Sequence, residues 1–380
     1  MTSSHSPRDR SVHSLAGRVA VVLGTRPELV RLAPVLHRLG ARGRLVHTGQ
    51  HWDEELSGRF VDELGLHTAV RLEGIGGRTR AGQIAHALDQ LDRLFTEERP
   101  SAVIVQGDTN ATLAGALAAN ALGIPLIHVE AGLRSHDRAM PEEHNRVMVD
   151  HLADILCAAT GTNRDNLVRE GVQPGRITLT GNTVVEVVLR ELPDADARHD
   201  LLRRHGLTAG GYLLATLDRP ENTDLPEPLR AVLTELGTLA DSGTPVLFPM
   251  GPRTAAAVAR HGLRRLVAPL RVVPPVGYAE FLGLARHAAL LVSDSDGVQE
   301  ECTVLKRPLL VVRRSTERPE AVDAGFAALV RPGPEVGVLA RAWLADLPER
   351  LSRLAATPSP YGDGRASARI AELSASLAPV

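Results

Sequence analysis

The chain has 380 residues, 43% of them hydrophobic, and a formal net charge of -2. This length is typical of two domains, and this composition can bury a substantial core. The near-neutral charge argues against bulk electrostatic binding to nucleic acid or membrane surfaces. Cys157 and Cys302 lie far apart and lack metal-binding spacing, which fits a reducing compartment.

The beginning of the chain does not resemble a signal peptide. The stretch 1–16 is rich in Ser, His and Arg and has no apolar segment, so we expect a disordered tail there. No apolar run anywhere reaches about 18 residues, so no membrane span is expected. These features predict a cytoplasmic enzyme.

The first half of the sequence alternates short β-rich runs with longer helical patterns. A helical period of apolar residues, for example, runs through Ile84, Leu88 and Leu91. The alternation predicts an α/β fold with a parallel sheet covered by helices on both faces. The strands expected in this half are 18–24, 43–49, 101–108, 125–132 and 176–182.

A polar, charged stretch near 191–210 interrupts the pattern, which then restarts. The strands expected in the second half are 212–218, 245–250, 271–275, 290–296 and 308–312. We therefore predict two Rossmann-like domains, over 17–195 and 205–360, with a final segment over 361–380. Ligands of such sheets bind beyond the carboxyl ends of the strands, so a cleft between the domains is the expected site.

Three acids are expected at one edge of the predicted sheet of the first domain, at or after strand ends: Asp108, Glu130 and Glu142. Charged groups at that edge must be either paired or functional, because the surroundings are apolar. Crowded carboxylates raise one another's pKa, which suits a general acid or base. The alternative is that Arg134 and Arg146 hold these acids in structural ion pairs.

Two other features of this half are less specific. The turn Gly24–Glu28 follows the first strand, and we expect Arg26 to point into the cleft, although an ordinary strand-to-helix turn would look the same. His47 and His51 are four residues apart but belong to a strand end without further clustered ligands, so no metal site is predicted.

Many separated motifs, in order along the chain, resemble the non-hydrolysing UDP-N-acetylglucosamine 2-epimerases. They are 24–28, 48–51, 106–119, 128–135, 141–146, 180–186, 296–301, 316–325 and 361–364. The resemblance implies a glycosyltransferase-B fold, in which two Rossmann-like domains face a cleft and the C-terminal helix packs back on the first domain. It also implies catalytic acids in the first domain and nucleoside binding in the second.

The family is thought to remove the sugar C2 proton and expel UDP, after which the glycal takes UDP back with a proton on the other face. The resemblance assigns this acid-base chemistry to Asp108, Glu130 and Glu142. It matches Arg26 to the arginine of the first loop and Glu301 to the glutamate that holds the ribose, with Tyr278 and Phe281 near the base.

Further substrate-binding residues are predicted from the same motifs: Gln50, His51, Arg146, Asn182, Asp218, Arg219, Ser295, Asp296, Gly297 and Arg318. No metal or nicotinamide cofactor is implied. The expected ligand is a nucleoside or nucleotide-sugar, and a homodimer is expected by analogy.

The sequence departs from the family pattern at three positions. Asp218 replaces a histidine in a Thr-x-His-Arg-type loop, Gly251 falls near a second family histidine, and Asp296 stands in a turn that normally reads Ser-Gly-Gly. A carboxylate ~4 Å from a phosphate charge, at an effective dielectric of ~20, costs about 4 kcal/mol. That energy corresponds to a roughly thousandfold loss of affinity for the phosphate group. The alternative is that Asp296 turns away and caps the following helix.

We therefore predict an epimerase with acid-base chemistry at a sugar carbon and an altered substrate, such as a nucleoside lacking the diphosphate. Three alternatives stay open at this point. One is a conventional UDP-N-acetylglucosamine 2-epimerase, another is a hydrolase or glycosyltransferase of the same fold, and the third is a catalytically inactive binding protein.

Overall fold

The computed structural model describes residues 14–51, 61 and 64–377, which form two compact units. The N-terminal unit takes Met1–Val187 and Tyr361–Val380, and the C-terminal unit takes Val188–Pro360. The tail predicted over 1–16 falls mostly outside the described residues. Leu15, inside that range, is buried, and its N–H donates to Glu98 at 2.7 Å.

The strands of the described N-terminal unit form one parallel sheet in the order β3-β2-β1-β4-β5-β6-β7. The central strands are buried along their whole length, as parallel strands covered on both faces require. Their bounds are β1 Val19–Leu23, β2 Gly43–His47, β3 Thr68–Arg71, β4 Ala102–Gln106, β5 Leu126–Ala131, β6 Ile155–Ala158 and β7 Ile177–Leu179.

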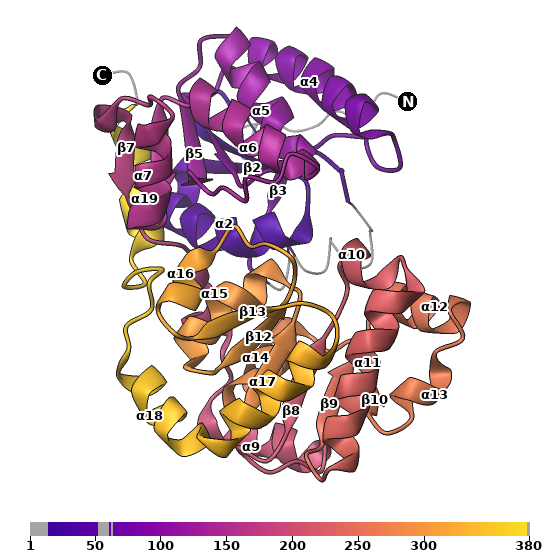
Figure 1. Ribbon diagram of the computed structural model, residues 1–380. Helices are drawn as coiled ribbons and strands as arrows, with labels where there is room; N and C mark the ends of the chain where they lie inside the picture. The colour runs from indigo at the N-terminus through magenta and orange to yellow at the C-terminus, as the bar shows by residue number, and fades with distance from the viewer. Residues whose placement is uncertain (1–13, 52–60, 62–63, 378–380) are drawn as a thin grey trace. The chain divides into compact units, whose positions relative to one another are not determined.

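Helices cover this sheet, and the last helix of the chain joins them (Figure 1). Ile370 and Ala371 of α19 pack in one core with Leu29 and Leu36 of α2, so the predicted return of the C-terminal helix is confirmed. The helix bounds are α2 Arg26–Leu39, α4 Arg80–Glu97, α5 Asn110–Ala121, α6 Pro141–Leu152, α7 Gly161–Arg169, α8 Val184–Glu191 and α19 Ala366–Ser376.

The C-terminal unit repeats this architecture with a parallel sheet in the order β10-β9-β8-β11-β12-β13. Its strands are β8 Leu213–Thr216, β9 Val246–Pro249, β10 Arg271–Val273, β11 Leu290–Ser293, β12 Leu309–Val312 and β13 Ala327–Val330. Its helices are α9 Ala195–Arg204, α10 Pro220–Thr223, α11 Pro226–Asp241, α12 Pro252–Arg260, α13 Arg264–Val267, α14 Tyr278–His287, α15 Asp296–Leu305, α16 Pro319–Asp323, α17 Pro334–Ala345 and α18 Leu347–Ala356. The predicted class, two Rossmann-like α/β units, is confirmed.

Both sheets reverse their strand order at one point. In the N-terminal unit β1 lies between β2 and β4, and in the C-terminal unit β8 lies between β9 and β11. Such a switch point opens a crevice at the carboxyl ends of the two strands, where ligands of doubly wound sheets bind. Arg26 and Asp108 follow β1 and β4, while Asp218 and Asp296 follow β8 and β11, so these residues lie at the switch points of their units.

The structure differs from the expected elements mainly at sheet edges. The short strands β3, β6 and β13 were not among the predicted strands. The sequences of the two edge strands, TAVR in β3 and AALV in β13, carry little β signal. Strand β11 ends at Ser293, before the predicted end at 296, because Asp294 leaves the ladder. Among the described residues, no helix combines the length and apolar character that a membrane crossing needs.

Candidate active site

Glu130 is held rigidly within β5 of the N-terminal unit. Both of its carboxylate oxygens lie 2.7 Å from Nη1 of Arg31, and amide groups of Gln106 and Asn182 donate to it at 2.5 and 2.9 Å. Its backbone has a φ of 64°, and the register of β5 against β6 shifts at this point. The left-handed conformation costs roughly 1–2 kcal/mol for a non-glycine residue. Such strain concentrates at functional sites because the surrounding contacts must maintain it.

Asp108 follows β4 and is paired with Arg146 of α6. Nε and Nη2 of Arg146 both donate to Oδ2 of Asp108, with Nε at 3.1 Å. Nη1 of the same arginine donates to Glu143 at 2.9 Å. The Asp108 side chain is 25% exposed, so a ligand can still reach it. Arg134, the other arginine considered as a partner, instead pairs with Asp150 and Glu170.

The two glutamates that open α6 have different environments. Glu143 is buried and accepts hydrogen bonds from the backbone N–H groups of Ser135 and His136 at 3.0 and 2.9 Å. Glu142 is exposed, and its carboxylate has no hydrogen bond or ion pair within the described residues. Glu143 therefore fixes the loop after β5, whereas the oxygens of Glu142 are open to a ligand.

The turn after β1 is tied to its neighbours through a buried carboxylate. Glu28 accepts from the N–H of Gly24 at 3.0 Å and from the hydroxyls of Thr25 and Thr109 at 2.8 and 2.9 Å. Burial raises the pKa of Glu28, and these hydrogen bonds partly offset that effect. Arg26 is the first residue of α2 and is exposed.

The loop after β2 meets the same turn. Oε1 of Gln50 accepts from the N–H of Ala111 at 2.9 Å, and the N–H of His51 donates to the carbonyl of Gly24 at 2.9 Å. Gln50 is buried while His51 is exposed. Gln50 thus positions the start of α5, beside Asp108, through its side chain.

In the C-terminal unit, Asp294 has a structural role. Its carboxylate accepts from the backbone N–H groups of Asp218 and Arg219 at 3.1 and 3.0 Å and from Nδ2 of Asn222 at 2.9 Å. Burial raises the pKa of Asp294, and these donors act in the opposite direction. The side chain faces the turn after β8, so it does not present a free carboxylate to a ligand.

Asp296 instead contacts three arginines, Arg219, Arg313 and Arg318, which we call the arginine triad. Oδ2 of Asp296 pairs with Arg219, Oδ1 pairs with Arg313, and Nη1 of Arg318 lies 3.8 Å from Oδ1. Ser295 occupies the N-cap position of α15. The side chain of Asp296 is therefore turned toward the arginines, and helix capping does not describe its role.

Other acids complete the neutralisation of the triad. Nε of Arg318 donates to Glu300 at 2.7 Å and its Nη1 donates to Glu317 at 2.6 Å. Nε of Arg313 lies 3.3 Å from Glu221, and its Nη1 lies 3.4 Å from Glu317. Among the described residues, the three guanidinium groups therefore face four carboxylates, counting Asp296, so these contacts leave no excess positive charge for an anionic ligand.

The other predicted residues of this unit lie around the same strand ends. The hydroxyl of Tyr278 donates to Oε1 of Glu301 at 2.9 Å, which links α14 to the first turns of α15. A Cβ built on Gly297 would lie 3.3 Å from that same oxygen, so glycine leaves room for Glu301. Phe281 is one turn further along α14 and is partly buried.

The two remaining departures from the family pattern are neighbours. A Cβ built on Gly251 would lie 3.4 Å from Oδ1 of Asp218. Asp218 is exposed, and its carboxylate has no hydrogen bond or ion pair within the described part of the chain. An unpaired acid therefore lies where the family pattern has histidines.

Arg31, Gln106 and Arg313 are among the residues of these clusters that were not predicted. Arg313 directly follows β12, so its strand-end position was a usable signal. Gln106 ends β4, two residues before Asp108. Arg31 lies within α2, and nothing local in the sequence indicates that it reaches Glu130.

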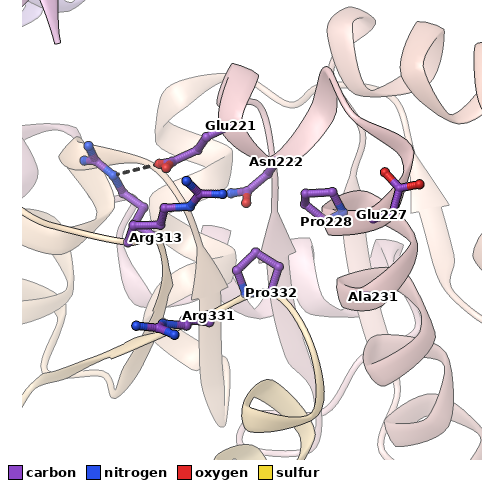
Figure 2. Close-up of a pocket in the computed structure, with 9 residues that line it drawn as sticks. Glu221, Asn222, Glu227, Pro228, Ala231, Arg313, Arg331 and Pro332 are labelled. Carbon is purple, nitrogen blue, oxygen red and sulfur yellow. Dashed lines mark hydrogen bonds and ion pairs between the residues drawn. The ribbon is translucent and has the colours of Figure 1, made fainter. Parts of the chain in front are cut away.

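Arg313 of the arginine triad lines a pocket of about 590 Å³ (Figure 2). Glu221, Arg313, Arg331 and Pro332 line it together with the beginning of α11.

Within the described residues, no three His, Cys, Asp or Glu side chains are grouped so as to hold a metal ion.

Comparison with known proteins places the chain in a family. The family model described as UDP-N-acetylglucosamine 2-epimerase matches residues 36–374. A UDP-N-acetylglucosamine 2-epimerase of Methanococcus maripaludis is 38% identical over 84% of this chain and 89% of its own length. A UDP-2,3-diacetamido-2,3-dideoxy-D-glucuronate 2-epimerase of Pseudomonas aeruginosa is 35% identical over 95% of this chain and 100% of its own length.

A solved structure agrees with these matches. The crystal structure of Methanocaldococcus jannaschii UDP-GlcNAc 2-epimerase in complex with UDP-GlcNAc and UDP has a TM-score of 0.82 and 35% identity, and covers 94% of this chain and 99% of that one. The protein therefore belongs to the UDP-N-acetylglucosamine 2-epimerase family and is an epimerase with two Rossmann-like units of the glycosyltransferase-B type.

Proposed function

We propose that this epimerase removes and returns a proton at a sugar carbon of a substrate that lacks a diphosphate, such as a nucleoside. The observation that carries the proposal is the position of Asp296, whose carboxylate pairs with members of the arginine triad. A phosphate group would compete with this carboxylate for the same guanidinium groups.

The N-terminal acids supply the proton chemistry in this proposal. A carboxylate takes the proton from C2 while the bond from C1 to its substituent breaks, and the substituent leaves with the electron pair. The resulting C1–C2 double bond then takes the substituent back as a proton is delivered to the other face of C2. Asp108 and Glu142 suit the proton transfers because their oxygens are accessible. Glu130 contributes a fixed negative charge, because its oxygens are already engaged by Arg31, Gln106 and Asn182.

The C-terminal residues supply the recognition of the nucleoside. Glu301, oriented by Tyr278, can accept hydrogen bonds from ribose hydroxyls. Asp218 adds a second open carboxylate, which suits hydroxyl or amino groups and repels phosphate. The balance of charge therefore favours a neutral or cationic group where the family pattern would have the diphosphate.

A conventional UDP-N-acetylglucosamine 2-epimerase is the second candidate. In its favour, relatives with this activity are 35–38% identical, and the arginines of the triad are present. This candidate requires the side chain of Asp296 to turn out of the triad when the diphosphate enters. A relative of equal identity acts on a different UDP-sugar according to its name, so identity at this level does not settle the substrate.

Deuterium incorporation distinguishes these candidates. The enzyme is incubated in heavy water with UDP-N-acetylglucosamine and, separately, with uridine and adenosine, and the sugar protons are followed by NMR. We expect exchange at C2′ of a nucleoside, no exchange in UDP-N-acetylglucosamine, and loss of exchange in Asp108→Asn. Exchange at C2 of UDP-N-acetylglucosamine with formation of the manno epimer would overturn the proposal.

Other outcomes of this experiment address the remaining alternatives. Release of free sugar would indicate a hydrolase, and dependence on an added acceptor would indicate a glycosyltransferase. The homodimeric state stays a prediction of the family resemblance, and the cytoplasmic location stays a prediction of the sequence features.

A further inference from the structure

Four basic side chains gather at the amino ends of β8, β11 and β12 in the C-terminal unit. They are Arg198 on α9, Arg286 on α14, and Lys306 and Arg307 just after α15, and we call them the basic cluster. Helices α9 and α14 pack against each other. Because the arginine triad follows the carboxyl ends of the same strands, the two groups lie at opposite edges of one sheet.

The described hydrogen-bond acceptors of the basic cluster are all uncharged. Nη1 of Arg286 donates to the carbonyl of Leu305 at 2.6 Å, and Nε of Arg307 donates to the carbonyl of Arg286. Lys306 donates to the carbonyl of Thr357 at 2.6 Å. Within the described residues, no carboxylate lies within 4.0 Å of any member of the cluster.

The positive charges act on one another and on His287. Nε of Arg198 donates to Nε2 of His287 at 3.2 Å. Burial, followed by Arg198, Arg307, Arg286 and His199, lowers the pKa of His287 to about 4. Burial and Arg286 lower the pKa of Arg307 to about 10. The cluster is thus a concentrated, partly buried region of positive charge.

Helix termini do not balance this charge. Helices α14, α15 and α18 end at His287, Leu305 and Ala356, and each C-terminus carries roughly half a negative charge. Three helix ends therefore offset about one and a half of the four positive charges, and more than two remain. Lys306, just after α15, has a φ of 57°, which is a left-handed conformation that glycine usually adopts after a helix.

We propose that the basic cluster binds a multivalent oxyanion of the phosphate or pyrophosphate type, either free or carried by a metabolite. Guanidinium groups suit this ligand because their forked N–H groups match the spacing of phosphate oxygens. The site is separate from the catalytic residues, and the inference does not depend on the proposed function.

Calorimetric titration with sodium pyrophosphate, at an ionic strength held constant with sodium chloride, tests the inference. We expect saturable binding to the wild type and at least tenfold weaker binding to Arg198→Gln and to Arg307→Gln. Arg203→Gln is the matched control, because Arg203 lies on the same helix but already pairs with Asp200 at 2.5 Å. It should bind pyrophosphate as the wild type does.

Circular dichroism checks that each variant is folded, and Lys306→Gln replaces any variant that is not. Titration with uridine monophosphate in parallel shows whether a nucleotide phosphate binds more tightly than the free anion. The inference is overturned if pyrophosphate gives no saturable heat, or if the cluster variants bind it as the wild type does. Binding altered by Asp296→Gly but not by Arg198→Gln would assign the anion to the catalytic edge and also contradict it.

Discussion

The two edges of the C-terminal sheet carry similar numbers of basic side chains in opposite electrostatic states. At the carboxyl edge, acids saturate the arginine triad, with Glu300 and Glu317 both buried beside Arg318. At the amino edge, the described partners of the basic cluster are carbonyl groups, an imidazole and the ring of Phe326, with no carboxylate among them. An arginine near a strand end therefore indicates an anion site only if neighbouring carboxylates do not already neutralise its charge.

The largest expected effect comes from removing one arginine at each edge. Arg318→Met would remove the arginine that pairs with the buried carboxylates of Glu300 and Glu317. Removal of one member of a buried ion pair typically destabilises by about 3–5 kcal/mol. Arg307→Met leaves no acid behind, so we expect a loss below about 1 kcal/mol. Urea unfolding of both variants measures the difference. Equal losses in the free energy of unfolding would show that the two edges do not differ in how acids neutralise their basic side chains.

A second change reopens the arginine triad to anions. Asp296→Gly removes the carboxylate that occupies it, and relief of about 4 kcal/mol of repulsion corresponds to a gain in UDP affinity approaching a thousandfold. Calorimetry should be done with Arg198→Gln also present, so that the basic cluster does not contribute. Asp323→Ala, at an exposed acid at the end of α16, is the control and should leave UDP affinity unchanged. An unchanged affinity in Asp296→Gly would mean that Asp296 does not exclude phosphate.

The smallest effect concerns pH at the amino edge. The pKa of His287 in the folded protein is about 4, below its ordinary value of 6.5. The unfolded chain therefore binds an extra proton between these values, and stability is lost as the pH falls from 6.5 toward 4. His287→Asn should flatten this part of the stability profile, as followed by urea unfolding at several pH values.

His136→Asn is the control for this pH effect. His136 is exposed and has a φ of 57°, a conformation that asparagine tolerates. We expect its profile to match the wild type. If His287→Asn keeps the full loss of stability at low pH, the positive field at His287 is weaker than the structure indicates.

The sequence predicted the arrangement of strands and helices better than the contacts between side chains. Alternating strands and helices were sufficient for the two sheets, because buried parallel strands have a clear apolar signature. Strand ends located Asp108, Glu130 and Asp296 at the ligand-binding edges, because carboxyl ends of parallel strands share one edge.

The partners of those residues could not be predicted from local patterns. Arg31 and Glu130 are 99 positions apart, and only the tertiary fold of the N-terminal unit brings them together. Asp294 and Asp296 are two residues apart in one turn, yet one holds a backbone loop and the other enters the arginine triad. Side-chain direction in an irregular turn depends on tertiary contacts, which spacing does not encode.

The most direct test of the central claim compares uridine with UDP in calorimetric titrations of the Arg198→Gln protein at matched salt. If Asp296 occupies the place of the diphosphate, UDP binds no more tightly than uridine. Binding of UDP a hundredfold tighter than uridine would contradict the account, because the arginine triad would then accept the diphosphate despite Asp296.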